Sequence, residues 1–153
     1  MLKIGDKAPS FTALDQNETI HSLSDYLGKK IVIYFYPKDM TSGCTTESCD
    51  FRDNLSRVKS GGAFVFGISP DSVKSHKKFE EKESLNFPLL SDQDKQICKA
   101  YFVWKEKSLY GKKYFGVERT TYIIDENGII SKIFNKVTVS GHVEDVLINL
   151  TQM

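Results

Sequence analysis

Apolar residues gather in short runs that predict alternating strands and helices. The run at 31–36 is continuous and rich in β-branched and aromatic residues, which is typical of a strand buried on both faces of a sheet, and Ala63–Ile68 has the same character. Between them, apolar residues from Phe51 to Val58 recur at the spacing of one helix face. This spacing predicts a helix from about Gly43 to Lys59, which the glycines that follow it would end.

The middle of the chain contains weaker signals. Asp71 or Ser72 is placed to cap a helix that runs to about Glu83, and the residues at 87–90 are short and extended. Ser91–Asp94 resembles a capping box that opens a helix to about Tyr101. The segment from Lys105 to Gly116 is polar and without clear periodicity, so we expect a loop there.

Both ends of the chain predict hairpins. Turn residues at 15–18 separate two short alternating runs, which indicates an N-terminal β-hairpin. Strands at 120–124 and 129–134 flank an Asn-Gly turn, and Ser140 would cap a last helix with one apolar face. This order predicts an α/β fold with a mixed central sheet flanked by helices. An ending of hairpin and helix is typical of thioredoxin-like domains.

Composition limits the possible classes. The 153 residues suit one domain, residues 1–153, and 40% hydrophobic residues indicate a globular chain. The 21 basic and 20 acidic residues are scattered, so we expect no nucleic-acid partner and no anionic membrane surface.

The apolar segments and the number of cysteines indicate where in the cell the protein is expected. No segment approaches the roughly 20 apolar residues of a membrane span, and the N-terminus lacks the apolar core of a signal peptide. Three cysteines, an odd number, do not suggest a secreted disulfide framework. We therefore expect a cytoplasmic protein.

Cys44 is the residue that most clearly predicts chemistry. It follows the buried strand at the carboxyl edge of the sheet and falls in the first turn of a predicted helix. Free backbone N–H groups and the positive end of the helix dipole favour a thiolate there, and helix N-termini lower the pKa of cysteine thiols. A thiolate is the form that attacks electrophiles.

Cys49 lies five residues further along the same predicted helix, on a polar stripe with Arg52 and Asp53. In an intact helix its Cα atom would lie about 8.6 Å from that of Cys44. A disulfide needs less than about 7 Å, so the two cysteines could pair only if the first turns unwind.

The other cysteine and the histidines have simpler readings. Cys98 sits in an apolar neighbourhood and is interpreted as a core residue. A C-x4-C spacing is a poor zinc half-site, and we predict no metal. His21, His76 and His142 are interpreted as surface or capping residues, and His142 is badly placed to be charged at a helix N-terminus.

The stretch from Tyr34 to Thr45 resembles the peroxiredoxin pattern P-x-x-x-T-x-x-C, here with Pro37, Thr41 and Cys44. With Thr46–Asp53 it is similar to the bacterioferritin comigratory protein, or peroxiredoxin Q, subfamily. The similarity extends over nearly the whole chain, through the segments 5–9, 87–92, 119–125 and 141–142.

This resemblance implies a thioredoxin-like fold and an antioxidant peroxidase that reduces hydrogen peroxide and organic hydroperoxides without metal or other cofactor. Cys44 matches the peroxidatic cysteine, and Cys49 matches the resolving cysteine of an intramolecular, redox-active disulfide. Arg119 matches the arginine beside the thiolate, and Thr41 the residue that positions the peroxide. Pro37 matches the residue that shields the cysteine.

Thioredoxin is the reductant that the resemblance implies, and we expect a monomer. Ser42 replaces the more usual proline of the family, from which we expect a looser loop and retained activity. Glu47 is interpreted as a residue that only counters the helix dipole.

Two other functional classes remain open from the sequence. A thiol–disulfide oxidoreductase shares the fold but normally carries C-x-x-C. A holdase or redox-sensing partner would need a large exposed apolar patch. Comparing insulin reduction with peroxide consumption separates the first class, and a Cys44→Ser variant separates the second.

Overall fold

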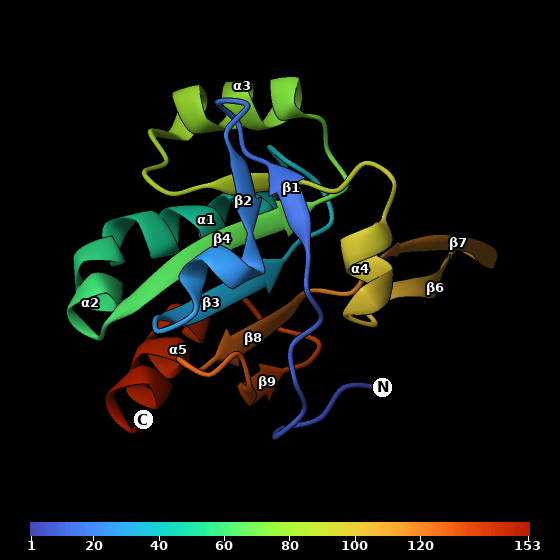
Figure 1. The fold of residues 1–153 in the computed structure, drawn as a ribbon. Helices are drawn as coiled ribbons and strands as arrows, with labels where there is room; N and C mark the ends of the chain where they lie inside the picture. Colours follow the sequence, from blue (N-terminus) through green and yellow to red (C-terminus); the bar gives the residue numbers. More distant parts are fainter.

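A five-stranded mixed sheet forms the centre of the computed structural model, which describes residues 1–153 (Figure 1). Its strand order is β5-β4-β3-β8-β9. The strands are β3 (Lys30–Phe35), β4 (Ala63–Ser69), β5 (Leu89–Ser91), β8 (Thr120–Ile124) and β9 (Ile130–Phe134). β3 pairs in parallel with β4 and antiparallel with β8, so the predicted mixed sheet is confirmed.

Helices and loops cover both faces of this sheet. The helices are α1 (Ser42–Asp53), α2 (Leu55–Ser60), α3 (Val73–Glu83), α4 (Gln96–Ala100) and α5 (His142–Thr151), with a short 3-10 helix, η1 (Leu23–Tyr26). Val32 and Tyr34 of β3 pack in one core with apolar residues of α1, α2, α3 and α5. Ile31 and Ile33 pack in a second core with residues of α4 and the N-terminal segment. Burial on both faces explains the continuous apolar run at 31–36.

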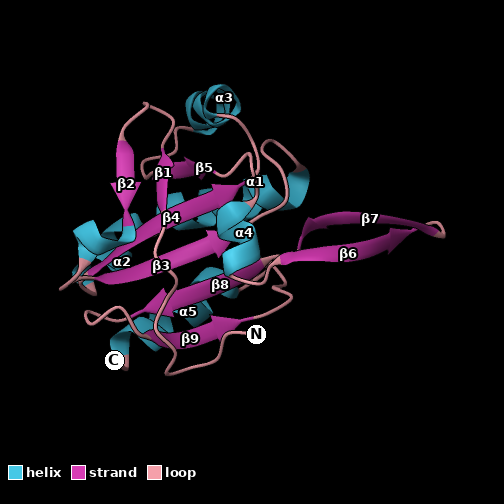
Figure 2. Cartoon of the chain, turned by 45° about the vertical axis from the view of Figure 1, so that its right-hand side comes forward, coloured by secondary structure: helices cyan, strands magenta, loops and turns pink.

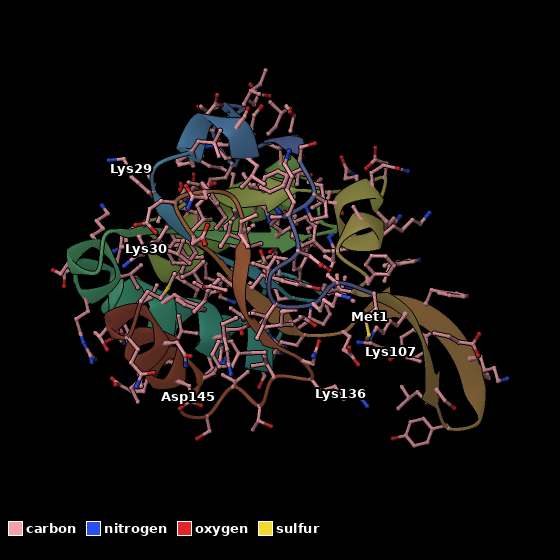
Figure 3. All side chains as sticks on the ribbon, turned by 60° about the horizontal axis from the view of Figure 1, so that its bottom comes forward. Met1, Lys29, Lys30, Lys107, Lys136 and Asp145 are labelled. Atoms are coloured by element: carbon pink, nitrogen blue, oxygen red, sulfur yellow. The ribbon has the colours of Figure 1, made fainter.

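Two hairpins lie outside the central sheet. β1 (Thr12–Leu14) pairs antiparallel with β2 (Ile20–Ser22), which confirms the N-terminal hairpin. β6 (Trp104–Leu109) pairs with β7 (Lys112–Val117) in a ribbon that projects from the body of the molecule (Figure 2). The loop predicted at 105–116 is therefore wrong. Figure 3 shows the ribbon standing apart from the body of the molecule, with Lys107 labelled on the side nearer that body.

The ribbon is joined by a two-residue turn with positive φ at both positions, 52° at Tyr110 and 76° at Gly111. That conformation matches the right-handed twist of paired strands. Because most of the ribbon's side chains are exposed, its sequence lacks the alternation that marks a half-buried strand.

Three predicted helix boundaries need correction. The helix expected from Gly43 to Lys59 is interrupted at Asn54 (φ −112°, ψ 13°), whose side-chain amide donates to the carbonyl of Asp50. The helix after Asp92 begins only at Gln96, since Asp92 accepts from two later backbone N–H groups instead of opening the helix. Gly141 at φ 78°, not Ser140, is the N-cap of α5. The cap of α3 by Ser72 is confirmed.

Tyr34 fixes α1 on the sheet. Its ring stacks on Phe51 of α1, and its hydroxyl hydrogen-bonds that of Ser48 at 2.8 Å. The opposite position on β4 is Gly67, where a Cβ atom would lie 2.8 Å from the Tyr34 ring. Only glycine leaves room for this ring, which sets the height of α1 over β3.

None of the helices has the length and apolar character that crossing a bilayer requires.

Candidate active site

Cys44 lies in the first turn of α1, beyond the carboxyl end of β3, as predicted. Its side chain is buried, with 1% of its surface exposed. Thr41 occupies the N-cap position, and its carbonyl accepts from the backbone N–H of Thr45 at 2.8 Å. The Thr41 hydroxyl donates to the carbonyl of Lys38 instead of capping the helix. Pro37 begins the connecting loop and is half-buried.

Arg119 reaches this helix terminus from the connection between β7 and β8. Its Nη2 atom lies 3.1 Å from Cys44 Sγ, and its side chain is 16% exposed. The base of the β6–β7 ribbon holds the connection, because Glu118 N donates to the carbonyl of Val103. A Cβ atom on Gly43 would lie 3.3 Å from Nη2, so the guanidinium crosses the helix start where no side chain intervenes.

Glu47 completes the charged group around Cys44. It is fully buried, and its Oε1 atom accepts from Arg119 Nη1 at 2.6 Å, while Oε2 has no hydrogen-bond partner. Burial raises the pKa of Glu47 to about 7, although the Arg119 charge opposes this shift. The interpretation of Glu47 as a mere dipole counter-charge is wrong. The sequence did contain a signal for this role, because Glu47 follows Cys44 by three residues and therefore lies on the same face of the helix.

Arg119 therefore bridges the sulfur and the carboxylate with its two terminal nitrogens. One fixed positive charge faces two groups that can each become negative. A guanidinium remains protonated at any working pH, so it can stabilise a Cys44 thiolate and negative charge that develops on an oxygen bound to it. The site can thus support nucleophilic attack by sulfur.

A buried network anchors the loop between β3 and α1. Asp39 accepts from Tyr36 Oη at 2.6 Å and from Ser75 Oγ at 2.8 Å. His76 Nδ1 lies 2.7 Å from Asp39 Oδ2, and its Nε2 lies 3.0 Å from the carbonyl of Leu90. A carbonyl only accepts, so Nε2 carries a proton.

The same network contains a group of potential metal ligands. Atoms of Asp39, Asp71 and His76 lie within 4.8 Å of one another. Both ring nitrogens of His76 and both oxygens of Asp39 already have hydrogen-bond partners. Asp71 accepts from the Asp39 backbone N–H at 2.9 Å. These contacts account for the group as a structural anchor of the loop.

The histidines are not the surface or capping residues that we predicted. His76 and His142 are buried, and His21 is largely covered, with its ring bonded to Asp15 and Tyr26. His142 lies in the first turn of α5 and bonds Thr121 Oγ1 at 2.8 Å. Burial lowers the pKa of His142 to about 4, which agrees with the expectation that it stays uncharged.

The other two cysteines differ in their surroundings. Cys98 is fully buried in the second core, as predicted, and burial raises the pKa of its thiol. Cys49 is half-buried on the outer side of α1, where its Sγ lies 3.6 Å from Glu83 Oε2. All three cysteines are free thiols in this structure.

Comparisons with known proteins agree with this geometry. The model of the AhpC/TSA family matches residues 4–133. A putative peroxiredoxin bcp of Coxiella burnetii is 50% identical over 95% of this chain and 97% of its own. Peroxiredoxin Bcp of Bacillus subtilis is 48% identical over 99% of this chain and 97% of its own.

Solved structures show the same likeness. Xylella fastidiosa PrxQ superposes with a TM-score of 0.95 at 39% identity, covering 99% of this chain and 97% of that one. The bacterioferritin comigratory protein of Xanthomonas campestris, studied for alkyl peroxide reduction, gives a TM-score of 0.89 at 42% identity, covering 93% and 90%.

The first prediction concerns Glu47 and the pH dependence of stability. The unfolded chain releases this proton near pH 4.5, whereas the folded chain keeps it to about pH 7. The folded state then binds more protons between these values, so this group lowers the free energy of unfolding by up to about 3 kcal/mol as pH rises through the window. Glu47→Gln cannot release a proton and so does not show this decrease. The free energy of unfolding of the variant minus that of the parent should therefore rise by up to about 3 kcal/mol between pH 4.5 and pH 8.

Urea unfolding at both pH values measures this difference. Glu126→Gln, on an exposed turn, is the matched control and should follow the parent chain. An identical pH dependence in Glu47→Gln and the parent would show that folding does not raise the pKa of Glu47.

The second prediction concerns Arg119→Ala. This substitution removes the positive charge that stabilises negative charge on Cys44 Sγ, so alkylation of Cys44 by iodoacetamide near pH 7 should slow by about tenfold or more. The rate should recover in part at higher pH. Arg57→Ala, which removes an exposed arginine on α2, is the control. A labelling rate that keeps its parental pH dependence in Arg119→Ala would exclude Arg119 from the site.

Proposed function

The chain belongs to the AhpC/TSA family, in the Bcp or PrxQ subfamily of peroxiredoxins, and from this membership we propose how its own residues reduce a peroxide. It is a peroxidase, and therefore an oxidoreductase that needs a peroxide substrate and a reductant. The observation that carries the residue assignment is the 3.1 Å contact between Arg119 Nη2 and Cys44 Sγ.

We propose that Cys44 is the peroxidatic cysteine for hydrogen peroxide and organic hydroperoxides. The thiolate sulfur attacks the terminal peroxide oxygen, a sulfur–oxygen bond forms and the oxygen–oxygen bond breaks. Cys44 becomes a sulfenic acid, and the other oxygen leaves and is protonated to water or an alcohol. Arg119 stabilises the thiolate and the charge that develops on the oxygens.

Thr41 is the proposed positioning group for the peroxide. Its hydroxyl proton is directed to the carbonyl of Lys38, so the lone pairs of Oγ1 are left to accept the O–H of a peroxide. Thr41 is exposed beside the buried Cys44, at the entrance that a substrate would use. Pro37, at the start of the same loop, is proposed to shield the sulfur from water.

Cys49 is the proposed resolving cysteine. Its thiol attacks the Cys44 sulfenic acid, a sulfur–sulfur bond forms, the sulfur–oxygen bond breaks, and the hydroxyl leaves with the thiol proton as water. The dithiol of thioredoxin then supplies two electrons and two protons to restore both thiols. Support for this assignment is that Cys49 is the nearest other cysteine in sequence and that Cys98 is buried in a separate core.

The third prediction tests the nucleophile. Cys44→Ser should abolish thioredoxin-coupled peroxide reduction, because a serine hydroxyl has far too high a pKa to replace a thiolate. Cys98→Ser is the control and should retain turnover, with a modest loss of stability from a hydroxyl in the core. Consumption of hydrogen peroxide and of an alkyl hydroperoxide is the measurement. Near-parental turnover in Cys44→Ser would refute the mechanism.

The fourth prediction concerns oxidation. A Cys44–Cys49 disulfide requires α1 to unwind, which loses several hydrogen bonds worth about 1 kcal/mol each. We expect the amides of residues 43–52 to lose hydrogen-exchange protection on oxidation, while those of 31–36 keep it. Non-reducing gels should show an oxidised monomer. A covalent dimer, or an oxidised chain with α1 fully protected, would contradict the proposal.

A further inference from the structure

The thiol of Cys49 has one specific partner, Glu83, the last residue of α3. Cys49 Sγ lies 3.6 Å from Glu83 Oε2, within the range of a sulfur hydrogen bond. An ionised carboxylate only accepts hydrogen bonds. The sulfur must therefore carry its proton to make this contact.

Further contacts hold the two helices together around this pair. The guanidinium of Arg52, on the same side of α1, donates to the main-chain carbonyl of Glu83. This carbonyl belongs to the C-terminal end of α3, where a positive charge is favourable. Asn86, just beyond α3, donates from its side-chain amide to the carbonyl of Arg52 at 3.4 Å. Cys49 therefore lies where contacts join α1 to the end of α3, whereas Cys44 belongs to the core.

The charges that face Cys49 come from both helices. Burial raises the pKa of its thiol, Arg52 lowers it, and Glu83 raises it again through its charge and its hydrogen bond. Asp53 on α1 adds a smaller effect in the same direction. The net direction is upward. Cys44, by contrast, has a guanidinium against its sulfur.

We propose that Glu83 is a positioning residue for the resolving half-reaction, which holds the Cys49 thiol through its hydrogen bond and keeps it turned away from Cys44 until α1 unwinds. The proposal rests on the resolving role proposed for Cys49. Two thiols on one helix must behave differently, since Cys44 has to meet peroxide as a thiolate while Cys49 has to remain unreactive. Unwinding of α1 removes Cys49 from Glu83 at the stage when its attack on the sulfenic acid is required.

The test measures the acidity of Cys49 without catalysis. In a Cys44→Ser background, the rate of iodoacetamide labelling of Cys49 is followed against pH by mass spectrometry of its peptide. Glu83→Gln, which keeps the side-chain shape and removes the charge, should lower the midpoint by about 0.5–1 pH unit. Labelling at pH 7.5 should then be about 3- to 10-fold faster, because the thiolate is the reactive form.

Two further variants separate the local contact from general effects. Glu81→Gln makes the same charge change at an exposed position of α3 and should leave the midpoint at its parental value. Glu83→Asp keeps the negative charge, so the pH midpoint of Cys49 labelling should stay closer to the parental value than it does in Glu83→Gln. Equal shifts in Glu81→Gln and Glu83→Gln would overturn the proposal, as would an unchanged midpoint in Glu83→Gln.

A purely structural role for Glu83 would give a different result. If the substitution only loosened α1, labelling would rise by the same factor at every pH with no change of midpoint, and this outcome also overturns the proposal. The resolving role itself is tested separately, by the loss of thioredoxin-coupled turnover in Cys49→Ser with Cys44 intact. Parental turnover there would refute the resolving role and leave the labelling result standing.

Discussion

The contact between the Arg119 guanidinium and the Cys44 sulfur is the interaction on which the site depends. A buried thiolate is costly unless a positive charge or hydrogen-bond donors compensate it, and Arg119 supplies both at 3.1 Å. The same guanidinium also holds Glu47, whose carboxylate is fully buried and only half satisfied. Because two potential anions share one cation, the charge state of Glu47 bears directly on how much of the Arg119 charge remains for sulfur and substrate.

Much of the fold serves to bring these groups to one point. β3 ends where α1 begins, and the stacking of Tyr34 on Phe51 fixes the height of the helix over the sheet. The β6–β7 ribbon matters for a different reason, since the pairing at its base directs Arg119 toward the helix terminus. The buried Asp39–His76 pair holds the intervening loop from the opposite side.

The sequence predicted features that depend on neighbouring residues and missed those that depend on distant partners. The buried run at 31–36 and the position of Cys44 in a first helical turn follow from local periodicity, and the structure confirms both. Arg119 could be connected with Cys44 only through family resemblance, because 75 residues separate them. His76 was interpreted as a surface or capping residue because its partner Asp39 lies 37 residues away, in the loop before α1. The ribbon was missed because a mostly exposed hairpin has no buried face to give it a pattern.

The helix that carries both cysteines has to satisfy opposing demands. It must be intact to present Cys44 at a helix N-terminus, and it must open if Cys44 and Cys49 are to meet. The structure limits how far such opening needs to extend. The loop before α1 is fixed at Asp39, and the break at Asn54 separates α1 from α2, whose Leu55 and Val58 are buried in the core. No side-chain cap closes the start of α1, so its first turn lacks a stabilisation worth about 1 kcal/mol. A helix start without a side-chain cap, between two anchored segments, fits the proposed function, in which one short helix holds Cys44 at its N-terminus and later releases it.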